Sequence, residues 1–277
     1  MKKVAVLGIK GSFHELAAKE YYINDNIEII NCISFNDIIS SVNNGSVDAG
    51  IMAIENSLAG SLLPNYTIAN ESGLSISGEI FIRIKQNLMA LPNQSINDIR
   101  EVHSHPMALQ QCDIFFKTHP NIKLIESDDT AYCAKNIATN KLNNVAAIAG
   151  INSAKIYGLE IIAEGIETNK RNFTRFWIIE NKSFSSISKD VNKSSLCFSL
   201  PHKHGSLSQV LSIFSFHNIN LTKIQSLPII GKEWEYLFYV DLVFENYERY
   251  KNSITAISAF SRNIKILGEY QTGRTNY

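Results

Sequence analysis

Thr174 and Arg175 are the two residues whose types suggest chemistry most directly. They stand side by side in NFTRFWII, residues 172–179, where a polar start leads into an apolar run typical of a strand. Arginine can hold a carboxylate through two parallel hydrogen bonds. A threonine hydroxyl is a weak nucleophile without an activating base, but it can donate a proton or a hydrogen bond to a leaving oxygen. For this stretch alone, a strand that begins in a loop with its polar residues in water remains the alternative.

Four other stretches place polar residues after an expected strand, at the point where a helix begins. Side chains of this kind commonly cap the first free N–H groups of a helix. The amides of a helix start also bind carboxylates, so capping and ligand binding are compatible. Four such starts at the carboxyl ends of strands suit an anionic small molecule. The candidates are Ser12; Glu55, Asn56 and Ser57; Ser104 and His105; and Thr130.

Several other polar residues have a simpler interpretation. His105 has no partner spaced for metal binding, so a cap or a surface position remains open for it. Lys170 and Arg171 are interpreted as solvated charges on a loop. No catalytic role is assigned to His14, Tyr66, His202 and His204.

The elements that must position these residues alternate between strand and helix. Strands are expected at residues 3–9, 27–33 and 48–54, with helices between them, which predicts a mostly parallel α/β sheet. A second α/β unit is inserted after it and opens with one long strand over residues 79–91. It continues with a helix over residues 106–118 before the chain returns toward residues 174–179. We therefore expect two lobes around a hinged cleft, lobe one at about residues 1–78 and 161–181 and lobe two at about residues 79–160.

The pattern changes after a serine-rich stretch, residues 182–194, which is interpreted as a linker. Residues 195–277 then read as strand, helix, two strands, helix and strand. The second of the two consecutive strands covers residues 234–244, where large apolar side chains recur at every other position. This βαββαβ order predicts an α+β domain of the ferredoxin-like type.

Composition narrows the class of protein. The 277 residues carry 26 Lys+Arg and 26 Asp+Glu, which gives no electrostatic footprint for nucleic acid. No apolar run reaches the length of a membrane span, and the N-terminus lacks the small-residue site of a signal peptide, so a cytoplasmic protein is expected. The four cysteines show no metal spacing and are expected to be buried thiols.

The polar stretches, taken in order, resemble those of the prephenate dehydratase family. The stretches that carry the resemblance are Ile-Glu-Asn-Ser…Gly-Ser at residues 54–61, Ser-His-Pro…Ala-Leu…Gln-Cys at 104–112, Ala-Ala-Ile-Ala…Tyr-Gly-Leu at 146–159 and Asn-x-Thr-Arg-Phe at 172–176. The resemblance covers nearly the whole chain. It implies a two-lobed domain over residues 1–181 that is similar to type II periplasmic binding proteins, with Asn172 and Phe176 among the substrate-binding residues.

The C-terminal segment resembles the ACT domain, a small module that binds amino acids. The resemblance implies effector contacts at Gly205, Ser206 and Leu207, at Asn220, Leu221 and Thr222, and at Gln225 and Ser226. The family usually has Glu-Ser-Arg-Pro where this chain has Gln225-Ser226-Leu227-Pro228. This chain therefore has neither the Glu nor the Arg side chain of that stretch.

Together the two resemblances imply an enzyme that converts prephenate to phenylpyruvate, CO₂ and water without a metal or organic cofactor. Thr174 would donate to the departing oxygen, Arg175 and the amides near Asn56 and Ser57 would hold carboxylate, and L-phenylalanine would act as an allosteric effector of a homodimer or homotetramer. Two alternatives remain: arogenate dehydratase, and a two-lobed protein that binds a small anion or amino acid without catalysis. No long helical extension precedes Lys3, so a single catalytic activity is expected.

Overall fold

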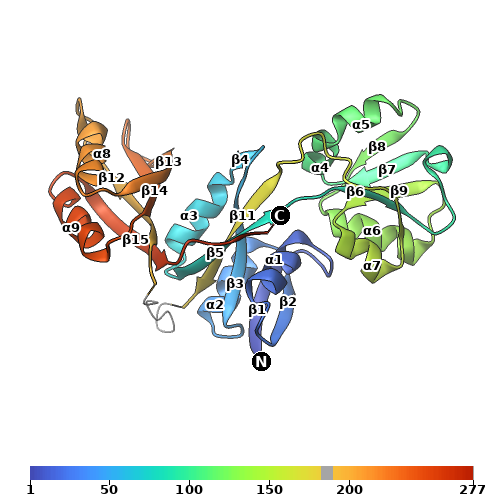
Figure 1. The fold of residues 1–277 in the computed structure, drawn as a ribbon, viewed down its shortest axis with the longest axis horizontal. Helices are drawn as coiled ribbons and strands as arrows, with labels where there is room; N and C mark the ends of the chain where they lie inside the picture. Colours follow the sequence, from blue (N-terminus) through green and yellow to red (C-terminus); the bar gives the residue numbers. More distant parts are fainter. Residues whose placement is uncertain (182–189, 277) are drawn as a thin grey trace. The chain divides into compact units, whose positions relative to one another are not determined.

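The computed structural model describes residues 1–181 and 190–276 (Figure 1). The chain forms two compact units. Unit 1 consists of Met1–Ser61, Ile80–Phe176 and Thr275–Tyr277, and unit 2 of Leu62–Glu79 and Trp177–Arg274. In the part of the chain that the structure describes, no helix is long and apolar enough to cross a membrane.

The first sheet is built around three parallel strands, β1 (Lys2–Leu7), β2 (Ile27–Cys32) and β3 (Ala49–Asn56). Its strand order is β16-β5-β11-β3-β1-β2, with β4 (Gly60–Ser61) beside β3. The further strands and the helices that follow β1 and β2 are β5 (Ser75–Arg83), β11 (Phe173–Glu180), β16 (Thr275–Asn276), α1 (Phe13–Tyr21) and α2 (Phe35–Asn43). The middle of β1 is fully buried, because its Val and Ala side chains form the core on both faces.

The second sheet of unit 1 has the order β10-β6-β9-β7-β8 (Figure 1, green). Its strands are β6 (Asn87–Ala90), β7 (Glu101–Ser104), β8 (Lys123–Glu126), β9 (Val145–Ala149) and β10 (Glu160–Ala163). The helices of this part are α4 (Pro106–Gln111), α5 (Asp113–Lys117), α6 (Thr130–Asn140) and α7 (Ile151–Tyr157), together with the 3₁₀ turn η1 (Ile96–Asp98). Two sheets confirm the predicted two-lobed α/β fold. The first buries the apolar side chains of β1 and β3, and the second packs one apolar cluster around Leu88 and Val102 and another around Met89 and Ala147.

Two predicted elements are broken in the structure. The long strand expected over residues 79–91 is divided into β5 and β6, which belong to different sheets. Between them the N–H of Ile84 donates to the carbonyl of Asn172 (2.7 Å), and the N–H of Gln86 donates to the Glu167 carboxylate (2.9 Å). These two N–H groups thus bond to residues 167–172, where the chain returns to the first sheet, and not to a neighbouring strand of a single sheet. The helix expected over residues 106–118 is likewise two helices, α4 and α5, which meet at Cys112.

The C-terminal part of unit 2 has the predicted βαββαβ order. Its elements are β12 (Lys193–Ser199), α8 (Ser206–Phe216), β13 (Asn220–Pro228), β14 (Tyr236–Val243), α9 (Tyr247–Ile257) and β15 (Arg262–Tyr270), and the antiparallel sheet order is β13-β14-β12-β15. β14 begins two residues later than predicted, because Trp234 has a left-handed backbone (φ 61°) and is 68% exposed. Of the predicted linker 182–194, residues 182–189 lie outside the described residues, and β12 already begins at Lys193.

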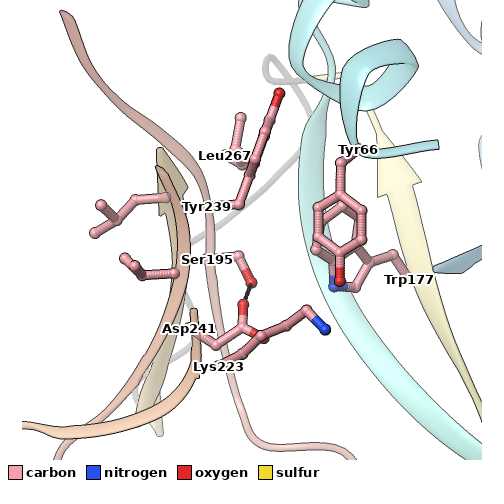
Figure 2. A pocket seen from close by; sticks show the side chains of 9 residues that line it. Tyr66, Trp177, Ser195, Lys223, Tyr239, Asp241 and Leu267 are labelled. Carbon is pink, nitrogen blue, oxygen red and sulfur yellow. Dashed lines mark hydrogen bonds between the residues drawn. The ribbon is translucent and has the colours of Figure 1, made fainter. Parts of the chain in front are cut away.

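Unit 2 also contains α3 (Leu63–Glu71), whose Tyr66 lies at the centre of a buried aromatic group. Figure 2 shows Tyr66 facing Trp177, and the ring centroids of Tyr66 lie 5.0 Å from Trp177 and 5.3 Å from Tyr239. Beside these rings the buried Asp241 carboxylate accepts a hydrogen bond from the Ser195 hydroxyl. Residues of α3, β11, β12 and β14 therefore share one core in this unit.

Candidate active site

Asn56 and Thr174 meet where β3 ends and β11 begins. The Asn56 amide nitrogen donates to the Thr174 hydroxyl oxygen (3.0 Å) and to the Asn172 side-chain oxygen (2.8 Å). The Asn56 oxygen accepts the N–H groups of Leu58 and Ala59, each at 3.0 Å. This turn fixes the amide, so its NH₂ group can only be directed at β11. The Thr174 oxygen thus accepts a hydrogen bond, and in the described residues its own proton has no acceptor.

A chain of amides extends this cluster. Asn172 is fully buried, and its nitrogen donates to the side-chain oxygen of Gln111 (2.8 Å), the last residue of α4. Gln86, in the crossover between β5 and β6, lies at 3.5 Å from the same oxygen. Gln111 and Gln86 were missed as site residues by the sequence analysis. The only available signal was that Gln111 lies in the same polar stretch as Ser104 and His105.

Ser57 fixes the start of β11 through the backbone. Its hydroxyl donates to the carbonyl of Arg171 (3.0 Å) and accepts the N–H of Phe173 (2.9 Å). Its own N–H donates to the carbonyl of Phe173 (2.8 Å). Ser57 therefore positions the backbone that precedes Thr174.

Arg175 lies on the opposite face of β11 from Thr174. Its guanidinium is 3.8 Å from the carboxylate of Glu55 and 5.9 Å from the ring centroid of Phe81, and its side chain is only 4% exposed. Neighbouring residues of a strand point to opposite faces, and the same alternation separates Glu55 from Asn56 on β3. The side chains of Thr174 and Arg175 therefore leave β11 on opposite faces, and a contact of Arg175 with substrate stays a prediction.

A recess in unit 1 carries two basic side chains that the sequence analysis also missed. It occupies about 390 Å³ including its open mouth and is lined by Gly11, Ser12, Phe13, Leu16, Arg83, Lys85, Gly150, Ile151 and Asn152. Arg83 and Lys85 flank Ile84, whose N–H binds the carbonyl of Asn172. The only sequence signal was two cations at period two in an otherwise apolar run.

Comparison with known proteins gives this arrangement a family. Residues 4–184 match the family model described as prephenate dehydratase. The chain is 35% identical over 285 residues to arogenate dehydratase/prephenate dehydratase 2, chloroplastic, of Arabidopsis thaliana, an alignment that covers 99% of this chain and 74% of the relative. The chain belongs to the prephenate dehydratase family. Membership confirms the predicted reaction class, the decarboxylating dehydration of prephenate to phenylpyruvate in phenylalanine biosynthesis.

Two solved structures share the fold of this chain. One is a prephenate dehydratase from Arthrobacter aurescens in complex with L-Phe, with a TM-score of 0.87, 27% identity and coverage of 97% of this chain and 89% of the other. The second is GqqA, described as a novel type of quorum quenching acylase, with a TM-score of 0.87, 26% identity and coverage of 98% of both chains.

The remaining predicted substrate-binding residues lie at helix starts or, for Ser104, at the end of strand β7. The Ser12 oxygen caps α1 by accepting the N–H of Glu15 (3.2 Å), and Ser12 lines the recess. His105 caps α4 by accepting the N–H of Met107 (3.2 Å). Ser104 is fully buried and donates to the carbonyl of Ile148 (2.8 Å). Thr130 is the first residue of α6, whose cap is instead Asp129. Contacts of Ser104, His105 and Thr130 with substrate stay predictions.

The aromatic residues of β11 anchor the strand. Phe176 is 1% exposed and lies edge-to-face against His14 of α1, with ring centroids 5.0 Å apart. Trp177, Ile178 and Ile179 that follow are also buried. This confirms that apolar packing fixes the backbone that carries Thr174.

His14 gives the prephenate dehydratase a testable pH response. Its Nε2 atom is buried without a partner among the described residues, and burial lowers the pKa of the imidazole from 6.5 to about 4. The unfolded chain therefore binds a proton on His14 below about pH 6.5, whereas the folded protein does so only near pH 4, so the free energy of unfolding falls as the pH drops through this window. In His14→Phe, urea unfolding should show a pH dependence less steep by up to about 1.4 kcal/mol per unit between pH 6.5 and 4.5. The exposed His204→Gln is the control, and an unchanged slope in His14→Phe would refute the assignment.

Proposed function

We propose that this prephenate dehydratase eliminates water from its substrate at Thr174. In prephenate, a hydroxyl at ring carbon C4 lies across the ring from C1, which bears a carboxylate. The electrons of the C1–carboxylate bond move into the ring, CO₂ leaves, and the C4–oxygen bond breaks. One proton is consumed in forming water. Aromatisation drives the step, so the protein needs no strong nucleophile.

The observation that carries this proposal is the hydrogen bond from Asn56 to Thr174. Because Asn56 occupies an acceptor position of the Thr174 oxygen, the hydroxyl proton is directed elsewhere, where a departing oxygen can accept it. Asn172 and Gln111 hold Asn56 in turn through buried hydrogen bonds. A weak acid depends on such placement, because its contribution comes from geometry and not from reactivity.

Arg175 and Glu55 have a different role in this proposal from the one predicted. Their charges face each other on the far side of β11 and β3, so the pair joins the two strands that supply Thr174 and Asn56. A nearly buried arginine beside a carboxylate stabilises one register of the two strands. We therefore assign both residues a positioning role.

The finer description of the fold belongs to the same proposal. We assign residues 1–181 to a catalytic domain that is similar to type II periplasmic binding proteins, and the βαββαβ part, which begins with β12 at Lys193, to an ACT domain. The two sheets of unit 1 and the βαββαβ order of the C-terminal part support these assignments. A cytoplasmic homodimer or homotetramer is the assembly that we propose.

We propose L-phenylalanine as the effector of the C-terminal part. Gly205 has φ 77° and precedes α8, so Ser206 and Leu207 stand at a helix start where a carboxylate can bind. β13, an edge strand, carries the remaining predicted contacts Asn220, Leu221, Thr222, Gln225 and Ser226. The L-Phe complex of the Arthrobacter aurescens protein supports this choice of ligand.

One assay tests both parts. Adding prephenate to the protein should produce phenylpyruvate absorbance, and L-phenylalanine should change kcat/KM by about 5- to 150-fold, the usual range of allosteric coupling. Tyrosine at equal concentration is the control for a general amino-acid effect. Binding of prephenate without product would favour the non-catalytic alternative, and turnover that is indifferent to phenylalanine would refute the regulatory part alone.

A further inference from the structure

We propose that Arg83 binds a carboxylate of the substrate and that the recess around it selects prephenate over arogenate. The inference rests on the proposed function, since it names the residue that supplies positive charge to that substrate. It takes over the carboxylate contact that the sequence predicted for Arg175, whose guanidinium lies 3.8 Å from the Glu55 carboxylate.

The first support is the position of Arg83. It is the last residue of β5, and it lines the recess together with the start of α1. The N–H of the next residue, Ile84, donates to the backbone carbonyl of Asn172. The side-chain nitrogen of Asn56 in turn donates to the side-chain oxygens of both Asn172 and Thr174. The backbone that carries Arg83 is thus tied to the segment that carries the reacting hydroxyl.

The second support is the state of the guanidinium. Its Nε atom is buried without a hydrogen-bond partner, and across residues 1–181 and 190–276 the Arg83 side chain has no ion pair. A buried donor of a charged group is costly to leave unpaired, so such a group calls for an explanation. The other cation of the recess, Lys85, differs because it pairs with Glu164 at 3.1 Å and both side chains are substantially exposed. A carboxylate of the ligand would pair Arg83 in the fork geometry that arginine offers.

The third support is the charge of the whole lining. The residues that line the recess include two cations and no carboxylate. Prephenate carries two carboxylates and a keto group, whereas arogenate carries an ammonium group in place of the keto oxygen. Both carboxylates and the ammonium lie at the C1 end, so the preference does not depend on which carboxylate Arg83 holds. An ammonium group held beside Arg83 would face a cation with which no carboxylate of the described residues is paired.

The experiment compares kcat/KM for prephenate and for arogenate in the wild type, Arg83→Gln and Arg83→Lys. The wild type should prefer prephenate. In Arg83→Gln, kcat/KM for prephenate should fall by about tenfold to hundredfold, as expected for the loss of a charge-assisted bidentate contact. The fall in kcat/KM for arogenate should be smaller by a factor of at least several. Arg83→Lys keeps the charge without the fork and should fall between wild type and Arg83→Gln on prephenate.

Lys155→Gln is the matched control, because Lys155 is an exposed cation on α7 that does not line the recess. It should change neither substrate by more than about twofold. Thermal unfolding of each variant separates misfolding from lost binding, and Arg83→Lys carries the test if Arg83→Gln unfolds. Equal losses on both substrates, no loss, or a wild type that prefers arogenate would overturn the proposal. A wild type that converts neither substrate would instead contradict the proposed function.

Discussion

Thr174→Ala should lower kcat by about 10²- to 10⁴-fold, the range that a positioned proton donor contributes. The variant removes the hydroxyl that Asn56 orients while leaving the apolar packing of Phe176 and Trp177 in place. The residue is only partly buried, so a change in stability should be small. Phenylpyruvate formation under saturating prephenate measures the effect.

Two further variants make this result specific. Thr174→Ser keeps a hydroxyl on the same carbon and should retain most of the turnover, whereas Thr174→Val keeps the shape and should not. Asn56→Ala should lower kcat less than Thr174→Ala does, because it frees the hydroxyl without removing it. If Thr174→Ala turned over prephenate at the rate of the wild type, Thr174 would have no part in the reaction.

Lys193→Met should lower the free energy of unfolding by about 3–5 kcal/mol, the cost of breaking a buried ion pair from one side. The Lys193 ammonium lies 2.7 and 3.0 Å from the two Glu79 oxygens, and their side chains are 6% and 0% exposed. Glu79 also accepts the N–H of Gly273 (3.1 Å). Without the lysine, the buried carboxylate loses the cation that lies against it. Urea denaturation measures the loss.

Two comparisons isolate the buried charge. Lys251→Met breaks an exposed pair with Glu248 (3.7 Å) on α9 and should cost no more than about 1 kcal/mol. Adding Glu79→Gln to Lys193→Met should recover part of the loss, because the neutral amide can still accept from Gly273. If Lys193→Met were as mild as Lys251→Met, the pair would not stabilise unit 2.

The sequence indicated the parts of the site that follow from local pattern. Thr174 and Asn56 could be found because each polar residue stands at one end of an apolar strand, and the observed sheet then places the two strands side by side. The Asn172–Gln111 contact joins residues 61 positions apart on different lobes, and no local pattern encodes such a distance. Arg83 and Lys85 were read as part of one long strand because period two continues through them. That same continuity concealed the crossover at residues 84–86.

The positions of Thr174 and Arg175 on opposite faces of β11 show a second limit of inference from a sequence motif. Adjacent residues of one motif invite a shared role, yet the pleat of a strand separates them. The alternation of strand side chains was already available from the sequence, so the expectation of a shared site came from treating the two residues of the motif as one unit. The same rule would have separated Glu55 from Asn56.

β5 and β11 each contribute residues to both compact units, since the divisions fall at Glu79–Ile80 and Phe176–Trp177. Unfolding of either unit would therefore remove part of β5 and β11 from the other unit. Calorimetry should record one cooperative transition in place of two, and cutting the gene at a presumed module boundary would yield a fragment with an incomplete core. Evolution could exchange the C-terminal part of such a chain only together with the strand ends that it shares.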